Sequence, residues 1–281
     1  MRKNVASLTL FGLLVIFMTS CTQDVVTPAA VADVRLDSTN SLGQRLVDKD
    51  GYALYYFSND ADGVSSCTGN CALNWQKFYI DSATATYGEG LSKADFGTIN
   101  PSSAGYQTTY KGWPLYRHIP GGVLEPAGDP QGEGIGNIWF VAKPTYSLMI
   151  ANFQLTDAAG ANFLANYTPG VGRTSYFTDA KGNTLYTFVR DSAFINKSNG
   201  NVNFPIYETD NITVPSTLDK SLFVVINYNG RKQLTYKGWP LYYYAPDNFV
   251  RGSNKGFHFP ATQPAGAIWP VAVRDVALAP R

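Results

Sequence analysis

The chain has 281 residues, 44% of them hydrophobic and 15% charged, and its formal net charge is +1. This near-neutral balance provides neither the basic face of a nucleic-acid-binding protein nor the basic cluster of a protein that binds anionic lipids. The 26 Gly, 16 Pro, 18 Tyr and 16 Phe residues favour strands and tight turns over helices. We therefore expect a β-rich fold and no nucleic-acid partner.

The N-terminal segment, residues 1–20, has the pattern of a bacterial signal peptide. Arg2 and Lys3 precede an apolar stretch, residues 5–18, which is shorter than the ~20 residues that a transmembrane helix needs. The stretch ends in Met-Thr-Ser-Cys at 18–21, which resembles the lipobox of bacterial lipoproteins, although Met18 departs from the favoured leucine. The sequence predicts cleavage before Cys21 and lipidation of that cysteine; an ordinary signal peptide is the alternative.

The segment after this cysteine predicts how the protein is attached. Residues 22–40 are rich in Thr, Pro, Ala, Asp and Ser without periodicity, so residues 21–40 are expected to be a lipid anchor, carrying diacylglycerol and palmitate, and a flexible tether. Thr22 stands where Asp would favour retention at the inner membrane. The expected location is therefore the cell envelope, at the outer membrane.

Two further cysteines, Cys67 and Cys71, lie close together in the chain. In an oxidising envelope they are expected to form a disulfide, whose small loop gives little entropic stabilisation and fixes a local bend. The same spacing permits a copper or redox site. The two histidines, His118 and His258, are expected at the surface rather than as metal ligands, and no cofactor is implied.

The chain contains a long internal repeat. Tyr-Lys-Gly-Trp-Pro-Leu-Tyr at 110–116 recurs without change at 236–242, and residues 50–57 resemble residues 181–188. These matches predict a first unit at 41–150, a linker at 151–171 and a second unit at 172–281.

A shorter motif recurs within each unit. Tyrosine is followed five positions later by aspartate in three places, and in a fourth copy, at Tyr116, the aspartate is replaced by Gly121. An aromatic residue follows each copy further along the chain. The three complete pairs are Tyr55 with Asp60, Tyr186 with Asp191 and Tyr242 with Asp247, and the later aromatics are Trp75, Trp139, Phe204 and Trp269.

The predicted elements are strands. Residues 45–57 and 174–188 each read as an apolar run, a turn and a second apolar run. Residues 222–244 read as a three-stranded meander, because Asn229-Gly230 is a strong hairpin signal and Lys237-Gly238 follows it. We expect an all-β protein of two homologous tandem β-rich units, whose four-fold pseudo-repeat permits a propeller-like or continuous-sheet arrangement. Two separate domains are the alternative.

Three of these motifs resemble a known family. Leu-Tyr-x-Phe-x-x-Asp, the cysteine pair followed by Ala72 and Trp75, and Thr-Tyr-x-Gly-Trp-Pro-Leu-Tyr are similar to the bacterial lipoproteins called the secreted repeat of unknown function. The resemblance implies an exported lipoprotein of tandem repeats and implies no activity. Gln76 departs from the family pattern, in which proline is common after the tryptophan, and the second unit has no cysteines.

The repeated residues have two interpretations each. The aspartates of the motif are expected to shape turns after strand ends, and the alternative is that they line a ligand site with their tyrosines. Trp113 and Trp239 are expected in the core, and the alternative is an exposed platform for sugars or for another protein. The candidate ligand-binding residues are Tyr55, Asp60, Tyr186, Asp191, Tyr242, Asp247, Trp113 and Trp239.

No catalytic arrangement accompanies these motifs in the sequence. We therefore expect a membrane-anchored envelope lipoprotein with a non-enzymatic binding or scaffolding role toward an unknown protein or glycan. The alternatives are a redox or copper-handling protein that uses Cys67 and Cys71, and a carbohydrate-binding surface protein.

Overall fold

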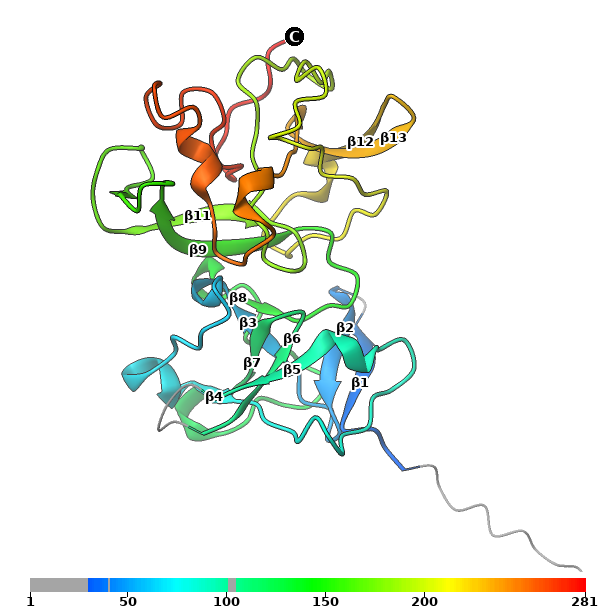
Figure 1. The fold of residues 1–281 in the computed structure, drawn as a ribbon. Coiled ribbons are helices and arrows are strands. Elements are labelled where there is room, and N and C mark those ends of the chain that lie inside the picture. The colour runs from blue at the N-terminus through cyan, green and yellow to red at the C-terminus, as the bar shows by residue number, and fades with distance from the viewer. Residues whose placement is uncertain (1–29, 40, 101–104) are drawn as a thin grey trace, which may run out of the picture. The chain divides into compact units, whose positions relative to one another are not determined.

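The computed structural model describes residues 30–39, 41–100 and 105–281, and Val31–Arg281 form one compact unit. Over these ranges the regular elements are β-strands and short 3₁₀ helices, and no α-helix occurs (Figure 1). The prediction of an all-β protein is confirmed. The predicted signal peptide and the lipidation site at Cys21 lie outside the described residues.

The first half of the chain forms a two-stranded sheet and a larger antiparallel sheet whose strands differ in length. In the larger sheet the strand order is β5-β6-β7-β3-β8, and β4 pairs with β7. The strands are β1 (Val34–Thr39), β2 (Gly43–Asp48), β3 (Tyr55–Phe57), β4 (Trp75–Lys77), β5 (Phe96–Ile99), β6 (Gln107–Tyr110), β7 (Trp113–His118) and β8 (Trp139–Val141).

The second half forms two three-stranded antiparallel sheets, with the orders β10-β9-β11 and β12-β13-β14. Within the described part of the chain the sheets do not close into a propeller. The strands are β9 (Met149–Thr156), β10 (Asn162–Phe163), β11 (Arg173–Thr178), β12 (Phe223–Tyr228), β13 (Arg231–Tyr236) and β14 (Trp239–Pro240). The 3₁₀ helices are η1 (Ser58–Asp60), η2 (Gly69–Leu73), η3 (Lys93–Asp95), η4 (Pro120–Gly122), η5 (Ile135–Asn137), η6 (Lys220–Leu222), η7 (Ala245–Asp247) and η8 (Lys255–His258).

Two segments that the sequence assigns to connections form strands. Residues 34–39, predicted as the end of the tether, form β1, because this segment pairs with β2 along its whole length and Val34 is fully buried. Residues 151–171, predicted as a linker, contain most of β9 and all of β10. β1 and β9 each pair with the strand that follows them in the chain, and β9 pairs also with β11.

The predicted meander is present, and the first half contains its counterpart. β12, β13 and β14 are consecutive antiparallel neighbours, as are β5, β6 and β7. The turns that close β6-β7 and β13-β14 both have positive φ at two successive residues: 48° and 82° at Lys111-Gly112, and 51° and 85° at Lys237-Gly238. Such turns match the twist of a hairpin, and the glycine at the second position tolerates the left-handed backbone.

A stack of three aromatic rings fills the centre of each repeat. In the first repeat Trp139 lies between Phe57 and Trp75, with ring centroids 4.0 Å and 3.6 Å away. In the second repeat the order is Phe188, Trp269, Phe204, with centroid distances of 4.2 Å and 3.7 Å. The later aromatics of the four motif copies therefore pair within each repeat.

The two repeats share part of their core. Tyr56, Trp113 and Phe140 of the first repeat belong to the same buried cluster as Tyr186 and Trp269 of the second. This shared cluster explains why residues 31–281 form one unit, since neither repeat buries all of its apolar surface by itself.

Candidate functional site

The tyrosines and aspartates of the repeated motif form buried hydrogen bonds, but the partners are exchanged between copies. Tyr242 donates to Asp191 (2.9 Å) and Tyr186 donates to Asp247 (2.5 Å). Each tyrosine therefore bonds the aspartate of the other motif copy in its repeat. These exchanged hydrogen bonds connect the two motif copies within one repeat.

The first repeat has the same exchange with one substitution. Tyr116 donates to Asp60 (2.6 Å), and Tyr55 donates to Glu125 (2.6 Å). Glu125 thus replaces the aspartate that is missing at Gly121. Sequence reasoning missed Glu125 because the acid stands nine positions after Tyr116 instead of five, and its longer side chain reaches the tyrosine from a different loop position.

Each carboxylate also holds a loop that follows it in the chain. Asp60 accepts hydrogen bonds from the backbone and the hydroxyl of Ser66, and Asp191 accepts one from the backbone of Lys197. Asp247 binds the hydroxyl of Ser253 and the backbone of Lys255. The aspartates therefore shape loops, as expected, and their oxygens are occupied by protein donors.

Burial dominates the titration of these acids. Asp60 and Asp191 are 0% and 1% exposed. Removal from water raises the pKa of each carboxyl to about 6, although the hydrogen bonds from Ser66 and Tyr116 to Asp60 act in the opposite direction. Burial likewise raises the pKa of Asp247. These groups lie inside the protein and not on an accessible surface.

The exchanged pairs predict a measurable cost when a hydroxyl is removed. Tyr242→Phe is expected to lower the free energy of unfolding by about 1–3 kcal/mol, because Asp191 stays buried with one donor fewer. Urea unfolding followed by circular dichroism measures the change. Tyr228→Phe is the control, because no hydrogen bond to its hydroxyl is present in the described structure, and an equal loss for both variants would contradict the structural role of the pair.

The two repeats differ at the position of His118. In the first repeat His118 packs against Trp75 (centroids 4.6 Å apart), and in the second Tyr244 packs against Phe204 at the same place (4.7 Å). His118 is 6% exposed and its Nδ1 lies 3.0 Å from Glu125, so the expectation of a surface residue is wrong. The sequence did not indicate this burial, because His118 is the last residue of β7 and its partners Trp75 and Glu125 come from other segments.

The cysteine pair is a disulfide at the edge of the first repeat. Cys67 and Cys71 are bonded, with Cα atoms 5.3 Å apart, and Cys67 is 1% exposed beside Phe57 and Trp75. Among the described residues no group of three or more His, Cys, Asp or Glu side chains is arranged to hold a metal ion. A redox or copper-handling role for the pair stays a prediction.

The two tryptophans of the repeated heptapeptide have different environments. Trp113 is 1% exposed, and its Nε1 donates to the carbonyl of Ala180 (3.2 Å). Trp239 is partly buried and donates to the carbonyl of Ala277 (2.8 Å). Trp113 therefore cannot serve as an exposed platform.

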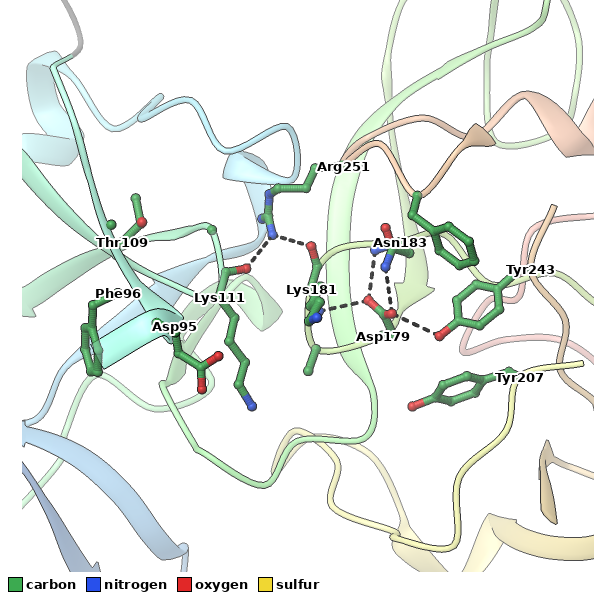
Figure 2. Close-up of a pocket in the computed structure, with 15 residues that line it drawn as sticks. Asp95, Phe96, Thr109, Lys111, Asp179, Lys181, Asn183, Tyr207, Tyr243 and Arg251 are labelled. Atoms are coloured by element: carbon green, nitrogen blue, oxygen red, sulfur yellow. Dashed lines mark hydrogen bonds between the residues drawn. The ribbon is translucent and has the colours of Figure 1, made fainter. Parts of the chain in front are cut away.

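A cleft of about 740 Å³ lies between residues of the two repeats. Figure 2 shows Asp95 and Lys111 of the first repeat on one side, and Asp179 and Tyr243 of the second on the other. Its size is within the range of small-molecule sites. Sequence reasoning assigned none of these residues to a site: Lys111 lies in the repeated heptapeptide, but nothing in the sequence places it near Asp179 or Tyr243.

Arg251 joins the two sides of this cleft. Its Nη1 donates to the carbonyls of Lys111 (2.9 Å) and Lys181 (2.5 Å) (Figure 2). Its guanidinium also lies 4.4 Å from the ring centroid of Trp113. Gly182 gives it room, since a Cβ there would lie 2.8 Å from Nη1. Loss of water around the side chain lowers the pKa of Arg251 to about 10, so it remains charged at neutral pH.

Comparison with known proteins supports the resemblance found in the sequence. No curated protein and no solved structure matches the chain significantly. In the described residues no helix is long and apolar enough to cross a membrane. Residues 38–78 and 224–256 match the family model described as a secreted repeat of unknown function. The first matched segment contains Tyr55 and Asp60, and the second contains Tyr242 and Asp247, so the protein carries two segments of the secreted repeat of unknown function.

Proposed function

We propose that this protein is a lipid-anchored protein of the bacterial envelope, attached at the outer membrane, whose repeat unit binds a ligand without catalysis. The observation that supports binding is the cleft between the repeats. The carboxylates of the repeated motif already accept hydrogen bonds from groups within the protein. By contrast, charged and aromatic side chains line the cleft at Arg251 and Lys181.

The fixed geometry of the cleft also favours binding over scaffolding alone. Arg251 bonds turns from both repeats, and Trp113 bonds the carbonyl of Ala180 on the opposite side. The walls are therefore held before a ligand arrives, which reduces the entropy that binding costs.

Membrane attachment is tested by substitution of the predicted lipid-bearing residue. Cys21→Ser in the full-length chain is expected to abolish incorporation of labelled palmitate and to move the protein from the membrane fraction to the soluble fraction. Cys71→Ser is the control, since it removes a cysteine and keeps Cys21. Retention of Cys21→Ser protein in the membrane fraction would overturn lipid anchoring, and density-gradient separation of the two membranes tests the outer-membrane assignment.

Binding in the cleft is tested without knowledge of the ligand. Hydrogen exchange of the purified lipoprotein, measured before and after incubation with a detergent-solubilised envelope fraction, is expected to slow at residues 179–183 and 247–252. Slowing confined to other regions would contradict the cleft as the binding site.

A further inference from the structure

The cations of the cleft differ in their electrostatic surroundings, since the charge of Arg251 is partly offset by Asp179 and other nearby carboxylates. None of the ion pairs between described residues involves Arg251, Lys181 or Lys111. Lys111 directs its amine to the carbonyl of Pro144 (2.8 Å). Lys181 is exposed, and its amine has no hydrogen bond in the described structure. The amine of Lys181 is therefore available to an anionic group.

The two carboxylates of the cleft are not equivalent. Asp179 accepts hydrogen bonds from two backbone amides, from the Asn183 side chain (2.8 Å) and from the Tyr243 hydroxyl (2.9 Å), so its oxygens are saturated. The Asp95 carboxylate has no hydrogen bond or ion pair within the described residues, and it lies on the opposite wall (Figure 2). Asp95 can accept hydrogen bonds from ligand hydroxyls, and it would repel a ligand whose polar groups are all anionic.

An exposed aromatic ring borders the same space. Phe249 is 61% exposed although its backbone has a positive φ of 53°, a conformation that is costly for a bulky residue. Its ring packs edge-on against Tyr243 with centroids 5.2 Å apart. The ring thus presents an apolar face beside the polar groups of the cleft.

We propose that the cleft binds an acidic saccharide, with the sugar carboxylate at the amine of Lys181, hydroxyl groups at Asp95 and the face of a sugar ring on Phe249. This inference rests on the proposed binding function of the cleft. A sugar acid supplies an anion, several hydroxyl donors and an apolar ring face together.

The test uses the lipidated protein in detergent micelles and isothermal titration calorimetry with three probes. Trigalacturonate is expected to bind, its methyl ester, which lacks the charge, is expected to bind at least tenfold more weakly, and triglutamate is expected not to bind. A hydrogen bond to a charged group contributes about 1.5–3 kcal/mol, which corresponds to roughly tenfold or more in affinity. Lys181→Ala and Phe249→Ala are each expected to weaken trigalacturonate binding by about tenfold.

Matched variants control for charge and for strain. Lys232→Ala removes an exposed lysine elsewhere, and Phe194→Ala replaces another exposed phenylalanine with positive φ. Both are expected to bind trigalacturonate normally. Absence of trigalacturonate binding, equal binding of its methyl ester, or preference for triglutamate would overturn the acidic-saccharide inference. Slowed exchange at the cleft with the envelope fraction would in that case still support the proposed binding function, and its absence would remove both.

Discussion

Trp139→Ala is expected to lower the free energy of unfolding by about 3–5 kcal/mol, because the side chain is 3% exposed and is packed on both faces. Its ring lies against Trp75 on one side and Phe57 on the other, and Tyr116 contacts its edge with centroids 5.1 Å apart. Removal leaves a cavity that these rings cannot fill. Urea unfolding followed by circular dichroism measures the loss.

Two variants make this expectation specific. Trp269→Ala removes the central ring of the second stack and is expected to have a similar cost, since Phe188 and Phe204 enclose it in the same way. Trp239→Ala removes a partly buried ring outside both stacks and is expected to cost less. If Trp139→Ala and Trp239→Ala lowered the free energy of unfolding equally, the stacked rings would not have the special role in stability that is expected of them.

Acidification from pH 7 to pH 4 is expected to stabilise the protein through its buried aspartates. The pKa of Asp60 and of Asp191 is about 6 in the folded protein and 3.8 in the reference state, so the folded state binds more protons between these values. Stability from these groups is therefore fully present below pH 3.8 and is lost as pH rises through 6. Each group contributes on the order of 2 kcal/mol, and Asp157, whose pKa is lowered beside His258, acts in the opposite direction.

The measurement is the free energy of unfolding in urea at several pH values between 4 and 8. Asp60→Asn and Asp191→Asn keep the size of the side chain and remove its titration, so each is expected to flatten the rise in stability between pH 6 and pH 4. A wild-type stability that falls steadily from pH 7 to pH 4, or double-variant protein with an unchanged profile, would contradict a raised pKa at these sites.

The local structure of this protein follows from short stretches of sequence. The Asn229-Gly230 and Lys237-Gly238 turns predicted the meander of β12, β13 and β14, because such residue pairs adopt positive φ and close hairpins with neighbouring strands. The predicted hairpin at 45–57 is only partly present: a turn in which Asp48 accepts hydrogen bonds from the backbone of Asp50 and Tyr52 is closed by the bridge between Val47 and Ala53, whereas residues 55–57 pair with β7 and β8.

For other features, the sequence identified the important residues but not the residues to which they bond or against which they pack. The tyrosine and aspartate motif was visible, yet Tyr55 bonds Glu125 and Tyr116 bonds Asp60, over separations of 70 and 56 residues. Burial of the later aromatics could be expected from their type, whereas the stacking of Trp75 on Trp139 depends on the pairing of β4 and β8 with other strands.

The sequence by itself therefore determined the all-β class, the internal repeat and the meander of β12, β13 and β14, because these are visible in residue composition and in short stretches of the chain. The tertiary structure decided the exchange of motif partners, the substitution of Glu125 for a missing aspartate, and the cleft at Arg251. Arg251 meets the carbonyl of Lys111 across 140 residues, and nothing in the sequence near either residue encodes that contact. Such contacts form only when the shared core brings the two repeats together, since side-chain partners at long range are selected by packing and not by local pattern.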